Sequence, residues 1–392
     1  MNDKKYLTVA AILFFISLSV VSSSGTTAIK HSIMPNFYGN TLYVGGDGPG
    51  NYSRIQDAID NASDGITVFV YNGTYYENIL INKQIVLKGE NKYNTTINGL
   101  RNDDTVTITS AKVIVTRFKI TNSSNDIESA WWKAGIRVIG SHITIDDNII
   151  SDNLLGIFCK QVKNLTIVNN IFENDGLNFY PYDGENLRPP LIIEHFIHTI
   201  QNNTVNGKPL LYYANQEDFE VPSNVGQLIA VNCTKMKIRN SSFSNTDFMV
   251  LMVFCSDCII ENSTFMNNDG VFSLLASDNN TIEFNNMSNN LHGILLDYYS
   301  KNNRIHHNHI SNNIYCGAIC EYLSNWNQIY CNNFINNQKN AHFILLSLYN
   351  KWHANYWDKP RVLPHLITGV PGLFITCWFN IDWYPAQEPY DI

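Results

Sequence analysis

The chain has 392 residues, of which 44% are hydrophobic and only 15% are charged, and its formal net charge is −8. A charged share well below the roughly 25% of an ordinary soluble domain, with a mean hydropathy of −0.15, excludes a disordered chain, a coiled coil and a protein of many membrane spans. The 26 Lys and Arg residues form no basic run, so no nucleic-acid partner is expected. The polarity comes instead from 54 asparagines.

Residues 1–25 are predicted to be a secretory signal peptide. Lys4 and Lys5 precede an apolar stretch from Leu7 to Val21, and three serines and a glycine follow it. This order is typical of an export signal, and the stretch is short for a membrane-spanning helix, although retention as an anchor stays open. The protein is therefore expected to be exported to the cell surface, the periplasm or the medium. Twelve Asn-x-Ser/Thr sequons agree with a glycoprotein.

A repeat of about 22 residues runs through most of the remaining chain. The pattern is Ile-x-x-Asn-x-apolar-x-Asn, and its copies are spaced by 22, 33, 38, 22, 22, 23 and 24 residues. Such a period is too short for a pair of helices. It fits one coil of a parallel β-helix, in which inward apolar side chains stack at about 4.8 Å from coil to coil. The copies begin at Ile145, Ile167, Ile200, Ile238, Ile260, Ile282, Ile305 and Ile329.

The asparagines are predicted to form the corners of this column. Asparagine tolerates the left-handed backbone conformation that tight turns require, and stacked asparagines can hydrogen-bond from coil to coil as a ladder. A β-sandwich with polar turns is the alternative, but it would not keep a 22-residue register over several copies. The column is expected to span residues 66–350, with about eleven coils.

Both open ends of the column are expected to be capped. Within an N-terminal cap over residues 41–65, Ser53 and Gln56 form a predicted capping box that opens a short helix. Its apolar face holds Ile55, Ala58, Ile59 and Ala62. The glycine-rich run before it lacks the Gly-Lys-Ser/Thr motif of a nucleotide-binding loop. The repeats stop near residue 350, so the aromatic segment 351–392 is the predicted C-terminal cap.

Several segments resemble exported right-handed β-helix proteins of the NosD-like group, which share the pectin-lyase-like fold and are common on archaeal surfaces. The resemblance lies in residues 42–60 and 73–77 near the start, 206–210 and 226–233 in the middle, and 355–358 near the end. It implies an all-β fold, a right-handed parallel β-helix. The family name further implies periplasmic copper handling and a copper-handling partner.

The residues themselves give little support to a metal site. Copper prefers His, Cys and Met ligands, and His306, His307 and His309 crowd one coil, where surface positions are expected. The pair Cys255 and Cys258 lies three coils, about 14 Å, from the next two cysteines, so four sulfurs cannot share one ion. No metal site is predicted, and no cofactor is assigned.

The spacing of one cysteine pair makes a more specific prediction. Cys233 and Cys255 are 22 residues apart, so they are expected to stack on adjacent coils within the Cα separation that a disulfide requires. Export permits oxidation. A disulfide and a pair of buried thiols both remain compatible with the sequence.

A polysaccharide hydrolase is the main catalytic alternative. Residues 245–247, 269–270 and 292–293 resemble, in order, three signatures of polygalacturonases, and they are spaced by 22 and 23 residues. However, one Asp stands where two are expected, and inverting hydrolysis needs two carboxylates around a water. We therefore expect a binding protein without catalytic residues. If the protein is an enzyme, it is predicted to be a glycoside hydrolase.

The predicted ligand is a polysaccharide or a cell-envelope glycan, bound in a groove along one corner of the column. Long insertions leave the repeat at this corner and carry aromatic residues, and carboxylates of later coils are expected at the same place. Loops on a rigid scaffold often carry function, and aromatic faces beside acceptors suit sugars. The predicted site residues are Trp131, Trp132, Tyr180, Tyr182, Asp247 and Asp269.

Overall fold

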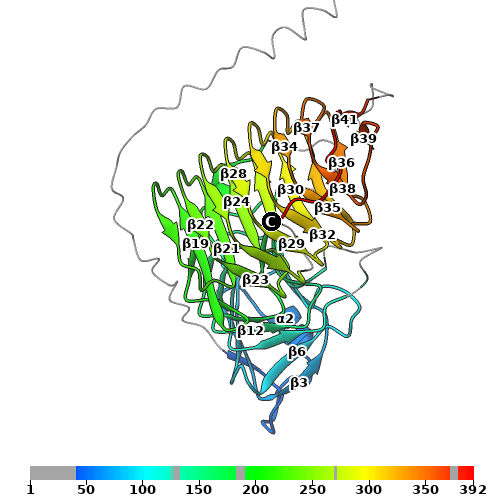
Figure 1. Cartoon of the computed structure of the whole chain (residues 1–392). Helices are drawn as coiled ribbons and strands as arrows, with labels where there is room; N and C mark the ends of the chain where they lie inside the picture. The colour runs from blue at the N-terminus through cyan, green and yellow to red at the C-terminus, as the bar shows by residue number, and fades with distance from the viewer. Residues whose placement is uncertain (1–40, 125, 127–132, 182–189, 269–271, 371–377) are drawn as a thin grey trace, which may run out of the picture. The chain divides into compact units, whose positions relative to one another are not determined.

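The computed structural model describes residues 41–124, 126, 133–181, 190–268, 272–370 and 378–392. In these ranges the regular structure is almost entirely short strands stacked in parallel (Figure 1). Helix is confined there to α2 (Ile55–Asn61) and the single turn η1 (Ile193–His195). The predicted all-β parallel solenoid is therefore confirmed. None of the helices in these ranges has the length and apolarity that crossing a membrane would take.

The first column of coils has three sheets, which we call I, II and III in the order in which each coil visits them. The strands of a sheet pair in parallel from one coil to the next. Sheet I contains β1 (Thr41–Val44), β2 (Thr67–Val70), β5 (Val86–Gly89), β8 (Ile114–Thr116), β11 (Thr144–Asp146), β14 (Thr166–Val168) and β17 (Thr199–Gln201). Sheet II contains β3 (Gly73–Tyr76), β6 (Thr95–Asn98), β9 (Lys119–Thr121), β12 (Ile149–Ser151), β15 (Ile171–Glu173) and β18 (Thr204–Val205). Sheet III contains β4 (Ile79–Ile81), β7 (Val106–Ile108), β10 (Ala134–Val138), β13 (Leu155–Lys160) and β16 (Leu177–Tyr180).

The second column repeats this plan with sheets IV, V and VI, and runs from green to red in Figure 1. Sheet IV contains β20 (Glu220–Val221), β22 (Lys237–Arg239), β25 (Ile259–Glu261), β28 (Thr281–Glu283), β31 (Arg304–His306), β34 (Gln328–Tyr330), β37 (Lys351–His353), β41 (Asn380–Asp382) and β39 (His365–Ile367). Sheet V contains β23 (Ser242–Ser244), β26 (Thr264–Met266), β29 (Asn286–Ser288), β32 (His309–Ser311), β35 (Asn333–Ile335) and β38 (Tyr356–Trp357). Sheet VI contains β19 (Lys208–Ala214), β21 (Gln227–Val231), β24 (Val250–Val253), β27 (Phe272–Leu275), β30 (His292–Asp297), β33 (Cys316–Cys320), β36 (Ala341–Ile344) and β40 (Gly369–Val370).

A hairpin joins the two columns. Strand β19 pairs antiparallel with β18, with Val205 opposite Lys208, so Asn206 and Gly207 form a two-residue turn. Both turn residues have positive φ, 51° and 76°, which is the backbone of a type I′ hairpin. The repeat therefore does not continue in one register from Ile200 to Ile238. Sheet I ends at β17, and a new sheet IV begins at β20.

Sheet VI is buried on both faces. Leu228 and Ala230 of β21 belong to the core inside the second column, whereas Ile229 and Val231 belong to the cluster that fills the first. At the open edge of sheet III, the side-chain amide of Gln227 accepts the N–H of Leu177 at 2.9 Å and donates to its carbonyl at 2.8 Å. The second column thus closes the far end of the first.

The near end of the first column is capped by α2, as predicted, but not through a capping box. Ile55, Ala58 and Ile59 are fully buried. The N-terminal N–H groups of the helix are bound by the carboxylate of Glu77, which accepts from Ile55 at 2.8 Å and from Gln56 at 3.1 Å. The expected bond from Ser53 is not formed, because the cap residue is Arg54, whose own side chain makes no capping hydrogen bond.

The side chain of Gln56 closes the other open edge of sheet III. Its amide accepts the N–H of Leu80 in β4 at 2.8 Å and donates to the Leu80 carbonyl at 3.2 Å. A glutamine amide therefore replaces the missing neighbouring strand at both ends of this sheet.

The predicted asparagine ladders are present in both columns. In the first, Asn148 donates to Asn170 and Asn170 donates to Asn203, with each Nδ2 to Oδ1 distance near 3.0 Å. The same chain of bonds links Asn285, Asn308, Asn332 and Asn355 in the second column. These side chains are buried and satisfy backbone groups at the corners, which holds each coil on its neighbour.

Candidate functional site

The residues of the predicted glycan groove do not form an exposed groove in the part of the chain that the structure describes. Tyr180 ends β16, and its ring lies against Phe158 with the centroids 5.3 Å apart. Tyr212, on another predicted insertion, packs inward, and its hydroxyl donates to the Phe196 carbonyl at 2.7 Å. Four predicted site residues lie outside the described residues: Trp131, Trp132, Tyr182 and Asp269.

Asp247 is buried where the two columns meet, rather than exposed as a hydrogen-bond acceptor for a sugar. It is 1% exposed, and its Oδ2 accepts from the backbone N–H groups of Gly156 at 2.6 Å and Gly176 at 3.0 Å, and from Nδ2 of Asn178 at 3.1 Å. These donors belong to the first column. Burial and then the charge of Asp247 raise the pKa of neighbouring Asp175 well above its usual range. A ligand-binding role of Asp247 stays a prediction, and in the structure its carboxylate is buried against the first column.

The cysteine pair lies as the 22-residue spacing predicts. Thr234 and Ser256 form a parallel bridge, which places the preceding Cys233 and Cys255 on adjacent coils. Both thiols are buried and free. The hydrogen bond with Cys255 lowers the pKa of Cys233 to about 7, although burial opposes this shift.

At one corner of the second column, the left-handed residue is not asparagine in every coil. The residue two positions before each of β22, β25, β28 and β31 has a left-handed backbone, and it is Lys235, Asp257, Asn279 and Asn302 in turn. In the next coil it is Trp326, with φ 60°. A bulky residue in this conformation costs free energy that asparagine largely avoids. Strain of this kind is typical of functional sites.

Around Trp326, aromatic side chains form a surface row that we call the aromatic edge, made of Tyr299, Lys301, Trp326, Tyr349 and Trp378. Trp326 and Tyr349 are 52% and 55% exposed and lie nearly parallel, with centroids 6.3 Å apart and an interplanar angle of 10°. Trp378 meets Tyr349 edge-on at 6.0 Å. Lys301 Nζ lies 5.5 Å from the rings of both Tyr299 and Trp326. The edge is a row of half-exposed rings in which Tyr349 and Lys301 lie against the ring of Trp326.

The opposite corner of sheet IV departs from asparagine as well. The residue after each strand of this sheet from β22 to β37 is left-handed, and Asn240 and Asn262 are followed in the next coils by Phe284, His307, Cys331 and Ala354. The ring of Phe284 stacks on His307 with centroids 5.3 Å apart. We call Phe284, His306, His307, Cys331 and Tyr390 the histidine corner.

Two histidine nitrogens converge at this corner. Nδ1 of His306 lies 3.0 Å from Nδ1 of His307 and 3.7 Å from a carboxylate oxygen of Glu283. Burial, followed by the charges of His307 and Arg304, lowers the pKa of His306 to about 4, so this ring is neutral at neutral pH. Among the described residues, however, no group of three His, Cys, Asp or Glu side chains is arranged to hold a metal ion.

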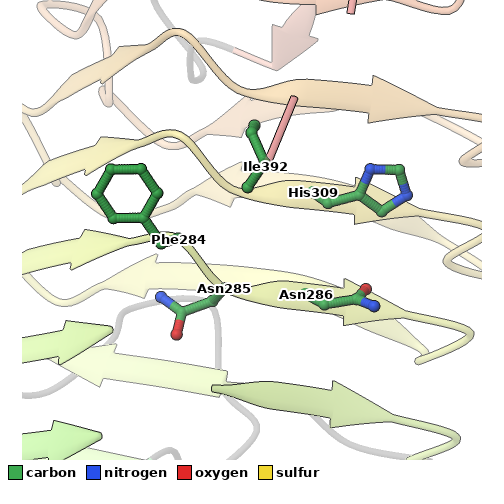
Figure 2. Close-up of a pocket in the computed structure, with 5 residues that line it drawn as sticks. All are labelled: Phe284, Asn285, Asn286, His309 and Ile392. Atoms are coloured by element: carbon green, nitrogen blue, oxygen red, sulfur yellow. The ribbon is translucent and has the colours of Figure 1, made fainter. Parts of the chain in front are cut away.

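A shallow pocket of about 310 Å³ lies next to the histidine corner. Figure 2 shows its lining, in which Phe284 and Asn285 come from the corner of one coil and His309 from the next. Asn286 and Ile392 complete it. The pocket is open, and its lining offers the imidazole of His309 and the amide of Asn286 to a polar ligand, because the amide of Asn285 is bonded within the buried ladder.

Both corners could have been found from the sequence by a different reading of the repeat. The predicted site was sought in the insertions between copies, whereas the aromatic edge lies in coils that keep the period. These corners can be recognised when the coils are aligned, because tryptophan, phenylalanine or histidine then stands at a position where earlier coils have asparagine. Aligning Asn302 with Trp326, and Asn262 with Phe284, makes this signal visible.

The stacked coils and buried ladders define a parallel β-solenoid. A comparison with protein families shows which family of solenoids part of the chain resembles. Residues 192–362 match the family model described as "Periplasmic copper-binding protein (NosD)". The match covers most of the second column and includes the strands that build both corners. The predicted resemblance to NosD-like proteins is thereby confirmed over this part of the chain. No curated protein matches the sequence.

Solved structures of similar fold include three that act on or bind polysaccharides according to their descriptions. The A-module of the Azotobacter vinelandii mannuronan C-5 epimerase AlgE6 is 13% identical, with a TM-score of 0.31 and coverage of 86% of this chain and 91% of that one. A double mutant of the periplasmic alginate epimerase AlgG is 12% identical, with a TM-score of 0.32 and coverage of 78% and 69%. A pectin methylesterase in complex with a hexasaccharide is 11% identical, with a TM-score of 0.29 and coverage of 63% and 79%. Identities this low say nothing about the ligand of the present chain.

Proposed function

We propose that the protein is an exported binding protein whose ligand is a carbohydrate, bound along the aromatic edge. The observation that carries this proposal is Trp326, a half-exposed tryptophan in a left-handed corner where two preceding coils use asparagine. Its ring stacks on that of Tyr349, and both side chains stay about half exposed, so the exposed part of each ring can contact a ligand. Sugar rings have an apolar face that stacks on aromatic rings while their hydroxyls stay hydrated.

Binding without hydrolysis fits the same arrangement. Inverting hydrolysis needs two carboxylates held around a water molecule. Asp247, the carboxylate that resembles the polygalacturonase signature, is buried at the junction and bound by N–H donors. The aromatic edge itself is built from rings and a lysine.

The decisive variant is Trp326→Asn, because asparagine already occupies this corner in the preceding coils and is compatible with its backbone. We expect the variant to fold normally and to bind glycan about tenfold more weakly, the loss of one stacking contact of about 1.4 kcal/mol. A glycan array identifies the ligand, and calorimetry measures the affinity. Tyr93→Ala removes an exposed ring on the first column and serves as the control. Unchanged affinity in Trp326→Asn, or no glycan bound by the wild type, would refute the proposal.

Copper handling is a second candidate function, supported by the family match and by the converging Nδ1 atoms of His306 and His307. Imidazole is a good copper ligand when it is neutral, and burial keeps His306 neutral. Copper would be cargo here, held by these two rings with Glu283 beside them. The matched variant is His307→Asn, because asparagine stands at this corner in two earlier coils. Copper analysis after dialysis should give about one ion per wild-type chain and none for the variant. Equal copper in both proteins would exclude this corner.

A further inference from the structure

The aromatic edge is bordered by positive charge. Lys301 Nζ lies over the rings of Tyr299 and Trp326, 5.5 Å from each centroid. A cation held over a ring face is attracted by the electrons of the ring, and it leaves its remaining hydrogen-bond donors for a ligand that stacks beside it.

Two more cations follow the same row. Arg304, Gln328 and Lys351 pair in register as the first residues of β31, β34 and β37. Each stands two positions after a corner residue, and the residue between them is a buried ladder asparagine. The outward side chains at the two positions are therefore neighbours, so Arg304 and Lys351, which are both exposed, border the edge two coils apart, with Gln328 on the coil between them.

Asp278 lies close to Lys301, whose backbone N–H it accepts at 2.7 Å and whose charge it feels, but none of the three cations forms a side-chain ion pair in the described part of the chain. Within the described ranges, no carboxylate oxygen lies within 4.0 Å of a charged nitrogen of Lys301, Arg304 or Lys351. Some cations elsewhere form ion pairs, as in Lys92–Asp147 at 2.7 Å and Lys235–Glu217 at 2.7 Å. In a chain of net charge −8, three cations along one row of half-exposed aromatic rings are a local concentration of positive charge.

We infer that the aromatic edge binds an acidic saccharide, one whose sugar rings carry carboxylate or sulfate groups. This inference rests on the proposed carbohydrate function and adds the charge of the ligand. Trp326 and Tyr349 stack on the sugar rings, and Lys301, Arg304 and Lys351 bind the anionic groups. Charge-assisted hydrogen bonds of this kind are stronger than neutral ones and fix the register of the ligand along the column.

Single-stranded nucleic acid is the other polymer that combines anionic groups with stacking faces. The aromatic edge is short, however, and the chain as a whole is acidic, which opposes binding to a polyphosphate. An acidic saccharide carries fewer charges per unit length. We therefore treat nucleic acid as an outcome of the test.

The test compares matched probes on the full chain by calorimetry in 50 mM and 500 mM salt. The probes are polygalacturonate and its methyl ester, dextran sulfate and dextran, and oligo-dT. We expect at least one acidic polymer to bind tenfold more tightly than its neutral partner, and to lose most of this advantage at high salt, because screening weakens exposed charge pairs.

The variant K301Q/R304Q/K351Q should weaken acidic-polymer binding about tenfold and neutral-polymer binding less than twofold. The control K112Q/R117Q/K119Q removes the same charge from the first column and should change neither by more than twofold. Equal binding of acidic and neutral partners overturns this inference but leaves the carbohydrate function standing. Failure to bind any saccharide removes the proposed function itself. Oligo-dT bound more tightly than every saccharide replaces the inference with nucleic-acid binding.

Discussion

The two columns are built from one repeat but treat their corners differently. In the first column the left-handed residues after the strands of sheet I are Arg117, Asp147, Asn169 and Asn202, which are small or polar side chains of a solvated turn. In the second column the corresponding series changes within a few coils from asparagine to phenylalanine, histidine and cysteine. The first column also has both ends closed. The difference shows that this corner of sheet IV accepts aromatic side chains where the corresponding corner of sheet I does not, and we propose that such departures from the repeat mark a ligand-binding surface.

The largest effect on the free energy of unfolding is expected from replacing an asparagine of the buried ladder. Asn308 is fully buried, and its amide bonds Asn285 on one side, Asn332 on the other and two backbone carbonyls. Asn308→Ala should lower the free energy of unfolding by about 4 kcal/mol, because it leaves several buried polar groups unsatisfied. Asn308→Ser should cost about half as much, because Ser241 and Ser263 hold earlier rungs of the same ladder. Urea unfolding measures both, and a cost below 1 kcal/mol for alanine would contradict the structural role.

The next prediction contrasts the two ends of sheet III. Gln227→Leu should destabilise the protein by about 3 kcal/mol, because the N–H and carbonyl of Leu177 lose their partners inside the junction. Gln56→Leu should cost about 1 kcal/mol or less, since water can replace the amide at Leu80 on the exposed end. Unfolding curves of the two variants give the comparison directly. Equal costs would mean that the junction is not sealed from water.

A third prediction concerns pH and His292, which lies on β30 in the second column. Burial lowers its pKa to about 4, whereas an unfolded histidine titrates near 6.5. The unfolded chain therefore binds the proton more tightly, and stability falls as the pH is lowered from 6.5 towards 4. At pH 5 this one group should cost about 2 kcal/mol relative to pH 7.5. His292→Phe keeps a ring beside Tyr315 and should remove that part of the pH dependence. If the stability of the wild type and of His292→Phe depends on pH with the same slope, the ring of His292 is hydrated in the folded protein.

The smallest expected effect has the opposite sign. Trp326→Asn should raise the free energy of unfolding by about 1 kcal/mol, because asparagine adopts the left-handed conformation at lower cost than tryptophan. The reverse change, Asn302→Trp, should lower it by a similar amount one coil earlier. Thermal melts of the two variants measure this pair. If Trp326→Asn is destabilising, the tryptophan is there for packing rather than for a ligand.

Much of the architecture could be predicted from the sequence, because a solenoid repeats the same local contacts. The period placed Ile145, Ile167 and their successors inside the column, and the asparagines on its ladders. The break between Ile200 and Ile238 was hidden by treating a spacing of 38 residues as an insertion. Asn206-Gly207 is a strong signal for a two-residue hairpin, and it marks the turn between the columns.

The contacts that could not be predicted join residues of different coils or different columns. Asp247 meets Gly156 and Gly176, which are 91 and 71 residues away, and neither spacing is a multiple of the period. Glu77 replaces the expected capping box because the coil that follows α2 brings its carboxylate under the helix. The site differs from the prediction for a related reason. Aromatic residues in insertions attract attention by composition, whereas Trp326 is informative only when the coils are aligned.

The hairpin at Asn206-Gly207 also sets the order in which a growing chain can complete its fold. When synthesis has reached β18, the coils of the first column can stack, but β16 still presents the bare N–H and carbonyl of Leu177. An unpaired strand edge readily recruits a strand from another molecule. The open edge of sheet III is covered only after β21 has been synthesised and the side chain of Gln227 has bonded Leu177. Chains that stall between these two points carry an adhesive end that the finished protein does not have.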